Sequence, residues 1–332
     1  MVEITNVLSL FDGLSCGQIA LKELGIIPDK YYASEIDKYA IMQTQHNFPE
    51  TIQLGSVLDV DVSKLEPIDM ILAGSPCNNF SAAGKRNGMS TVENEEVYTL
   101  ERYLQLKSEG FQFEGQSYLF WEYMRILTDI RKYNPNVKFL LENVEVGNKW
   151  EHIISEAIGI YGVHINSALV SAQQRKRIYW ANLRVKEAGL FGKLFSDIPQ
   201  PDDKGITLKD ILEENVDEKY FLSKKGLSGM LNHKERHASK GNGFGVQFIT
   251  PESQKSNTIL QRGYKDCKDN ALFLSPERIR RLTPTEASRL QTVPSWYKWI
   301  VSETQQYKML GNGWTVKVIM HILKHLIKYD DK

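Results

Sequence analysis

A cysteine and a glutamate that each follow an apolar segment are the residues best placed for covalent chemistry. Cys77 comes after the apolar run 68–73, which stops at Gly74-Ser75-Pro76, and a second run, 137–141, leads into Glu142. If the two runs are neighbouring strands, thiol and carboxyl meet in one crevice, a pair suited to covalent chemistry on a heteroaromatic ring. Taken alone, each residue has an ordinary interpretation, since a lone cysteine is usually a small buried hydrophobe and a strand-end glutamate is usually solvated.

Length and composition limit the classes of protein that the chain can be. Its 332 residues, 42% hydrophobic and 25% charged, suffice for one large globular domain and a smaller one. No apolar stretch reaches the roughly 20 residues of a membrane span, and the first residues lack the pattern of a signal peptide. We therefore expect a cytoplasmic protein with no membrane partner.

Cysteine usage favours free thiols over disulfides or a metal centre. The three cysteines, Cys16, Cys77 and Cys267, are too few for a disulfide framework. No Cys-x-x-Cys or His-rich spacing typical of zinc occurs. We therefore expect reduced thiols in a reducing compartment, and no metal.

Charge is balanced overall but uneven along the chain. The 41 basic residues equal the 41 acidic ones, yet residues 220–268 hold nine basic side chains, Lys255 among them, against three acidic ones. The preceding residues, 197–218, are acidic. A basic segment is compatible with a polyanionic partner such as nucleic acid, although a run of charge is usually only a solvated face.

Strand-like and helix-like segments alternate along the first part of the chain. This alternation predicts an α/β fold with a mostly parallel sheet, helices on both faces and ligands at the carboxyl ends of the strands. After residue 183 the alternation stops, and we expect residues 184–272 to form a separate irregular domain with short strands. The predicted strands are 6–11, 31–34, 68–73 and 137–141, and the predicted helices are 16–24, 37–48, 118–133, 283–291 and 314–327.

The turn after the first predicted strand has the features of a nucleotide-like site. Residues 11–17 contain two glycines where the chain bends tightly and lets backbone approach a ligand. Glu35, at the end of the second strand, is placed to accept hydrogen bonds from ribose hydroxyls. The turn lacks the third glycine of a dinucleotide fingerprint. An adenosyl cofactor without a pyrophosphate, such as S-adenosylmethionine, fits this combination.

The motifs together resemble the DNA (cytosine-5) methyltransferase family. They occur in the family's order and span most of the chain, which makes the set specific although no single block is decisive. The Asn78-Asn79 pair and the Trp-containing final block particularly resemble the animal de novo enzymes and their bacterial or phage-type relatives. The blocks are the 11–17 turn, Pro76-Cys77, Glu142-Asn143-Val144, Gln173-Gln174-Arg175-Lys176-Arg177, Arg281-Leu282-Thr283-Pro284 with Glu286, Arg289-Leu290-Gln291, and Gly311-Asn312-Gly313-Trp314-Thr315-Val316.

The resemblance implies a mechanism for four residues. Cys77 would add as a thiolate to cytosine C6, so that C5 attacks the sulfonium methyl. Glu142, kept partly neutral by a buried pocket, would stabilise the charge that develops at N3. Arg177 would contact the O2 side of the base, and Arg175 would hold a neighbouring phosphate or structural carbonyls. Because stacked neighbours cover C6 in a duplex, the target nucleotide must be flipped out.

The resemblance also implies a Rossmann-like S-adenosylmethionine-dependent methyltransferase sheet and a set of cofactor contacts. The family often has Asp after Gly at the end of the third strand, to accept from the adenine amino group, but here Gly55 is followed by Ser56. The expected product is S-adenosylhomocysteine. The expected cofactor residues are Phe11, Asp12, Gly13, Gly17, Glu35, Ile36, Ser56, Val57, Pro76, Leu119, Asn312 and Trp314.

The expected domains are 1–183 (catalytic and cofactor-binding), 184–272 (a smaller target-recognition domain) and 273–332 (a return to the catalytic domain). Between the catalytic loop and residue 116 lies a stretch, 89–115, that is longer than the family's usual loop. It is either a mobile extension that orders over DNA or a docked surface helix near residues 100–104. The expected DNA contacts are Ser81, Lys85, Arg86, Thr258 and Arg262.

Three functions are compatible with the sequence. The favoured one is a site-specific methyltransferase that acts as a monomer on double-stranded DNA in the cytoplasm, associated with the nucleoid or encoded by a phage in its host. A transfer-RNA cytosine-5 methyltransferase is the second, although the Cys-Phe-Thr element expected of it is absent. A catalytically silent DNA-binding relative is the third, against which the intact Cys77, Glu142 and Arg177 argue. The recognition sequence, and whether a cognate restriction endonuclease is a partner, stay open.

Overall fold

The computed structural model describes residues 4–76, 89–189, 192–265 and 267–326. The chain divides into two compact units, one of residues 1–165, 176–200 and 320–332, the other of 166–175 and 201–319. These bounds differ from the expected ones, since 184–200 group with the first unit and 273–319 with the second. The assignment of 184–272 to target recognition stays a prediction. In the part of the chain that is described, no helix is long and apolar enough to cross a membrane.

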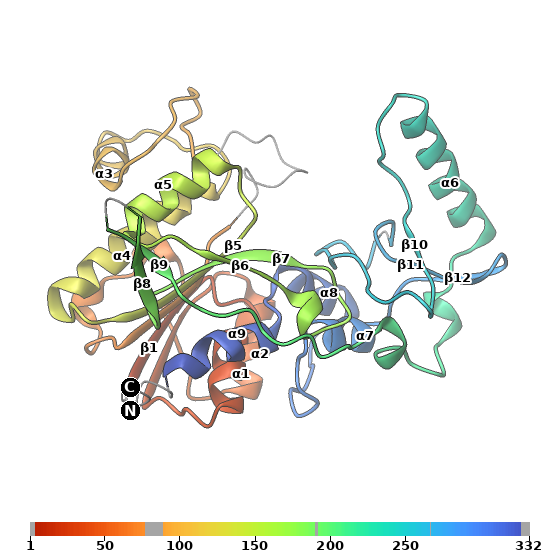
Figure 1. Cartoon of the computed structure of the whole chain (residues 1–332), viewed down its shortest axis with the longest axis horizontal. Helices are drawn as coiled ribbons and strands as arrows, with labels where there is room; N and C mark the ends of the chain where they lie inside the picture. The colour runs from red at the N-terminus through yellow and green to blue at the C-terminus, as the bar shows by residue number, and fades with distance from the viewer. Residues whose placement is uncertain (1–3, 77–88, 190–191, 266, 327–332) are drawn as a thin grey trace. The chain divides into compact units, whose positions relative to one another are not determined.

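A mixed sheet forms the centre of the first unit (Figure 1). Its order, β3-β2-β1-β4-β5-β7-β6, reverses direction beside β1, the crossover point at which α/β sheets bind ligands. The pairs among β1 to β5 are parallel and β7 is antiparallel to β5, which confirms the mostly parallel sheet. The strands are β1 (Asn6–Leu10), β2 (Lys30–Ser34), β3 (Ile52–Gln53), β4 (Met70–Gly74), β5 (Lys138–Val144), β6 (Val163–Asn166) and β7 (Lys176–Ala181), with a separate hairpin of β8 (Val185–Ala188) and β9 (Lys193–Ser196).

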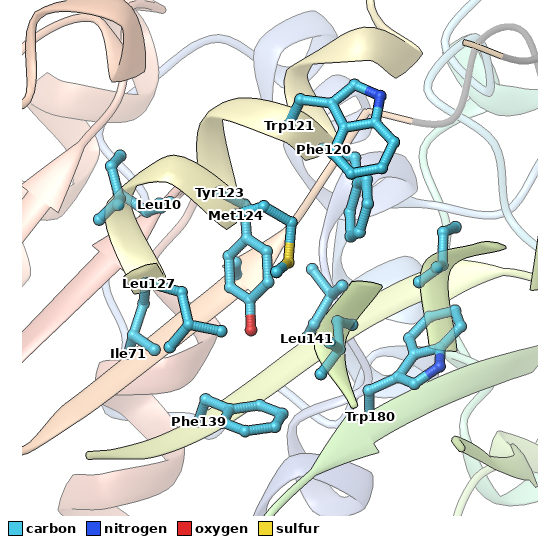
Figure 2. Packing of buried hydrophobic residues seen from close by; sticks show 14 of the residues in the cluster. Leu10, Ile71, Phe120, Trp121, Tyr123, Met124, Leu127, Phe139, Leu141 and Trp180 are labelled. Carbon is cyan, nitrogen blue, oxygen red and sulfur yellow. The ribbon is translucent and has the colours of Figure 1, made fainter. Parts of the chain in front are cut away.

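Helices cover both faces of this sheet, as the alternation predicts. Figure 2 shows α4 (Phe120–Tyr133) laying Tyr123, Met124 and Leu127 over Phe139 and Leu141 of β5. All five side chains are buried, and each contributes about 2 kcal/mol of burial free energy. Helix α5 (Asn148–Ile158) packs on the same face. The other helices near the start of the chain are α1 (Cys16–Glu23) and α2 (Lys38–Asn47).

The opposite face is approached closely by α1 because Gly17 has no side chain. A Cβ at Gly17 would lie 2.5 Å from Leu72 Cδ1. Leu72 points away from the α4 face, since its strand neighbours Ile71 and Ala73 belong to the α4 cluster and side chains alternate along a strand. The second glycine of the 11–17 turn is therefore required for packing of helix against strand.

The stretch 89–115 is docked on the first unit. It contains α3 (Leu100–Ser108), which confirms a short helix near residues 100–104. Met89, Val97, Tyr103 and Leu106 are fully buried and belong to the same core cluster as α4. The structure therefore shows the insertion docked on the first unit, and its movement over DNA stays a prediction.

The second unit is less irregular than the sequence predicts. It contains a helix of 15 residues, α6 (Lys224–Ala238), which begins at Ser223, whose side chain accepts from Gly226 N. The Thr283-Pro284 block with Glu286 is a capping box that starts α7, and Glu286 also pairs with buried Arg280. The other elements are β10 (Phe248–Ile249), β11 (Ala271–Ser275), β12 (Arg278–Arg280), α7 (Pro284–Leu290) and α8 (Glu303–Asn312), while α9 (Val316–Leu323) runs from this unit into the first.

Candidate active site

The two chemistry-bearing segments meet at the carboxyl edge of the first unit's sheet. In the parallel pair of β4 and β5, Gly74 lies opposite Glu142. The chain beyond Gly74 is tied to the same place, because Asn143 Nδ2 donates to Ser75 Oγ at 2.9 Å and to its main-chain oxygen at 3.3 Å. Cys77 lies outside the described residues, three positions after Gly74. The structure therefore holds the start of the cysteine loop beside the glutamate.

Glu142 is paired with Arg177 of the neighbouring strand. Arg177 Nε lies 3.0 Å from Glu142 Oε1, and the two side chains are 13% and 10% exposed. The antiparallel register explains the contact, since Arg177 is opposite Val144 and so lies diagonally across from Glu142. This arrangement gives the buried carboxyl a fixed orientation at the sheet edge. The sequence did not predict that Arg177 would be the ion-pair partner of this carboxyl.

Arg175 has a different surrounding from Arg177. It is 3% exposed, and its guanidinium donates to the main-chain oxygens of Gly313 at 2.8 Å, Gly311 at 3.2 Å and Ile259 at 3.3 Å. All these partners belong to the second unit. Of the two uses expected for Arg175, the structure shows the carbonyl one. These contacts support a structural use of Arg175 within the second unit, and a part in catalysis stays a prediction.

The 11–17 turn is built on strained backbone and on Glu35. Phe11 and Ser15 have φ of 58° and 63°, in the left-handed region that costs a non-glycine residue free energy. Glu35 accepts from the backbone N–H of Gly13 at 2.8 Å and also from those of Ile36 and Asp37. The carboxylate thus joins the ends of the first two strands. Its two oxygens have further acceptor capacity for ribose hydroxyls.

Asp12 is a buried acid inside this turn. Its Oδ1 accepts from Tyr31 Oη at 3.1 Å, while among the described residues its buried Oδ2 has no hydrogen-bond partner. Burial raises the pKa of Asp12 to about 6, against hydrogen bonds from Ser9, Ser15 and Tyr31 that lower it. A buried, unsatisfied carboxylate oxygen is a rare and costly feature. It fits a site that is completed by a cationic ligand.

The remaining cofactor residues of the first unit differ in exposure and surroundings. Ile36 is 73% exposed beside Glu35, which leaves its side chain available to an adenine ring. Ser56, which stands where the family often has Asp, caps a short 3-10 helix (Val57–Asp59) by accepting from Leu58 N. Val57 is buried, and Leu119 packs on the α4 core cluster.

Predicted residues of the second unit are placed only within that unit. Asn312 ends α8 and Trp314 is buried just beyond it. Gly311 leaves no room for a side chain, since a Cβ would lie 2.1 Å from Gln261 N. Thr258 Oγ1 donates to Gln174 O at 2.6 Å, and Arg262 lines a small pocket with Tyr307. The expected DNA contacts Ser81, Lys85 and Arg86 lie outside the described residues.

The sequence did not identify the roles of three further side chains. Asn143 and Ser75 bond to each other just before the cysteine loop, and both residues stand in motifs that the sequence singled out, Glu142-Asn143-Val144 and Gly74-Ser75-Pro76-Cys77. Lys255, counted with the basic segment, donates its Nζ to the main-chain oxygens of Ala168, Ser171 and Ile206 and is therefore unavailable to a polyanion. Within the described ranges, no group of three or more His, Cys, Asp and Glu side chains is arranged to hold a metal.

Comparison with known proteins assigns the chain to a family. The model of the C-5 cytosine-specific DNA methylases matches residues 5–328. The Type II methyltransferase M.DsaV of Dactylococcopsis salina is 30% identical over 98% of this chain and 86% of its own length, and M.NlaX of Neisseria lactamica is 29% identical over 97% and 96%.

Solved structures agree on the fold. The methyltransferase EhMeth of Entamoeba histolytica has a TM-score of 0.70 at 15% identity over 99% of both chains, and the S. pombe Dnmt2 methyltransferase has 0.65 at 17% over 98% of both. This is the S-adenosylmethionine-dependent methyltransferase fold. The chain belongs to the C-5 cytosine-specific DNA methylase family and is a DNA (cytosine-5) methyltransferase.

Proposed function

We propose that the enzyme methylates C5 of a flipped-out cytosine in a specific sequence of duplex DNA, through a covalent bond between Cys77 and C6. The observation that carries this proposal is the pairing of Gly74 with Glu142, reinforced by the Asn143–Ser75 hydrogen bonds. Because of these contacts, the cysteine loop begins at the sheet edge where the Glu142 carboxyl pairs with the Arg177 guanidinium.

The chemistry follows from these three side chains. The Cys77 thiolate bonds to C6, which moves electron density of the C5–C6 double bond and the ring toward N3 and C5. Glu142 supplies a hydrogen bond or proton at N3, where that density collects. Arg177 holds Glu142 and contacts the O2 side of the base. Once C5 carries the methyl group, a base removes the C5 proton, the C6–S bond breaks, and any proton on N3 returns to Glu142, which restores the aromatic ring and the Cys77 thiolate.

The cofactor is S-adenosylmethionine, which supplies an electrophilic methyl and leaves as S-adenosylhomocysteine. The first unit offers residues that fit it. Asp12 presents a buried carboxylate oxygen for the positively charged methionine end, Glu35 accepts from the ribose, and exposed Ile36 covers the adenine. Ser56 and Val57 lie on the adenine side, with Pro76 and Leu119 lining the pocket. For Asn312 and Trp314, which belong to the second unit, the family resemblance alone supports a part at the methionine end, and we expect no metal.

Target selection belongs to residues 184–272, and the enzyme acts as a monomer. Base-edge contacts specify sequence, and Thr258 and Arg262 are the candidate contacts in this segment. Several relatives carry the name Type II methyltransferase, which favours a cognate restriction endonuclease as a further partner, whereas the relative M.SPRI of Bacillus phage SPR is named an orphan.

The test is transfer of labelled methyl to duplex DNA, followed by sequencing of 5-methylcytosine in DNA from a host that expresses the enzyme. We expect methylation of one short sequence motif. Label that appears on transfer RNA alone, or on cytosine N4, would contradict the proposal. Exchange of residues 184–272 for those of a relative should change the methylated motif to that of the donor. A folded, active chimera with the original motif would place selection outside this segment.

A further inference from the structure

The insertion 89–115 is joined to the rest of the first unit by a fully buried carboxylate. Glu122 of α4 is 0% exposed and receives donors from two helices. Tyr103 Oη of α3 donates to its Oε1 at 2.6 Å, and Lys107 Nζ of α3 reaches the same oxygen. On the other side, Arg125 Nε of α4 donates to Oε2 at 2.7 Å. The insertion therefore provides two of the three charged or hydroxyl partners of this acid.

Arg125 continues the connection to the segment that follows Ser56. Its Nη2 donates to the main-chain oxygen of Val57 at 3.2 Å and its Nη1 to that of Val60 at 3.1 Å. The guanidinium thus bridges two carbonyls of a loop that has a short 3-10 helix and little other regular structure. Because Arg125 is fixed by Glu122, and Glu122 by α3, the position of this loop depends on the insertion.

Electrostatic interactions stabilise the cluster of Glu122 with Tyr103, Lys107 and Arg125. Burial opposes ionisation of Glu122, but hydrogen bonds from Lys107, Tyr103 and Arg125 outweigh it and lower the pKa of the carboxyl. The half-exposed Lys107 is the outer partner of Glu122, and Tyr103 and Arg125 are its inner ones. The ion cluster therefore keeps Arg125, and the loop carbonyls that it contacts, in a fixed position.

We infer that Glu122 and Arg125, held by Tyr103 and Lys107 of the insertion, are positioning residues that set the adenine-side loop 56–60 for cofactor binding. This inference rests on the proposed function, which places Ser56 and Val57 beside the adenine. The insertion then acts as a structural support for cofactor affinity, although it lies outside the pocket. Arg125 donates to two main-chain oxygens of this loop, so we expect its replacement to change cofactor binding more than DNA binding or the chemical step.

The experiment measures binding of S-adenosylhomocysteine by titration calorimetry and hydrogen exchange of amides 56–60 without ligand. Arg125→Lys keeps the charge beside Glu122 but cannot bridge both carbonyls, so we expect about tenfold weaker binding and faster exchange. KM for S-adenosylmethionine should rise in proportion, while kcat and KM for DNA stay within about twofold. Lys107→Met, on the half-exposed side of the cluster, should weaken binding by about threefold without disturbing α4.

The control is Arg102→Met, which breaks a bidentate pair with Glu95 inside the same insertion but does not reach α4. It should bind like the wild type. Wild-type affinity and exchange in folded Arg125→Lys and Lys107→Met proteins would overturn the inference, and so would equal weakening by the control. If the wild type itself fails to bind S-adenosylhomocysteine, the proposed function is what fails.

Discussion

Arg175 and Arg177 stand two residues apart in one motif, yet the structure uses them in different units and for different purposes. Arg175 connects segments of the second unit by donating to three of its main-chain oxygens. Arg177 belongs to β7 in the first unit and pairs with Glu142 at the sheet edge. The comparison teaches that two identical side chains in one short motif can differ in role, one stabilising the fold and one forming the site, according to the unit to which each belongs.

The largest effect should come from the acid that Arg177 orients. Glu142→Gln keeps the size of the side chain but removes the proton-donating carboxyl and the charge that pairs with Arg177. We expect kcat to fall by about 10² to 10⁴, the usual contribution of a positioned acid. Single-turnover methyl transfer on duplex DNA measures it, with DNA affinity as the control. An unchanged rate would remove Glu142 from the mechanism.

Replacement of Arg175 should mainly lower the stability of the protein, whereas replacement of Arg177 should mainly lower its turnover. Arg175→Met removes a donor from the main-chain oxygens of Ile259, Gly311 and Gly313, the last of which also accepts from Gln291 Nε2, so the free energy of unfolding should fall by about 3 kcal/mol. Arg177 lies at the sheet edge, so Arg177→Met should cost less stability than Arg175→Met but reduce kcat by at least about tenfold. Denaturant unfolding and steady-state kinetics test both. If Arg177→Met is the less stable variant and keeps full turnover, the comparison is reversed and our assignment is wrong.

A smaller effect concerns Asp12 and pH. Its pKa is raised from 3.8 to about 6 in the folded protein, so the stability gained from the neutral form is complete below pH 4 and is lost as pH rises through 6. Asp12→Asn removes that loss and should stabilise the ligand-free protein by about 2–3 kcal/mol at pH 7.5, with no gain at pH 4. Thermal unfolding across pH 4–8 provides the measurement. A constant difference across that range would show that the carboxyl does not titrate as described.

The same residue should act oppositely on ligand binding. Wild-type affinity for S-adenosylhomocysteine should decrease as pH falls through about 6, because protonated Asp12 no longer attracts the cationic methionine end. The Asp12→Asn protein should bind weakly at every pH. Equal affinity of the two proteins at pH 7.5 would place the ligand's charge elsewhere.

Much of the first unit was predictable because its signals are local. The alternation of strand and helix, and the ends of β4 and β5 at Gly74 and Glu142, follow from apolar runs and from the rule that parallel strands share a carboxyl edge. The Arg177–Glu142 pair was not predictable as a contact, since it depends on the register of an antiparallel strand more than 30 residues away. Periodicity carries no information about such a register.

Helix α6 and the contact between Tyr103 and Glu122 could not be predicted from the sequence, for physical reasons. Helix α6 contains Gly226 and Gly229 and buries no residue, so neither propensity nor an apolar stripe indicated it. The contact of Tyr103 with Glu122 spans 19 positions and places an acid in a core, where sequence reasoning expects apolar side chains. Both depend on tertiary neighbours that supply the missing stability.

The central claim is that the Cys77 thiolate bonds to cytosine C6, and one measurement tests it most directly. Duplex DNA that carries 5-fluorocytosine in the methylated motif is incubated with the enzyme and S-adenosylmethionine, because fluorine at C5 cannot leave as a proton and the adduct is trapped. The account predicts a protein–DNA complex stable to denaturant, with the crosslinked peptide containing Cys77, and no complex with Cys77→Ala that still binds the DNA. A wild-type enzyme that methylates normal DNA but forms no adduct, or a Cys77→Ala protein that forms one, would contradict it.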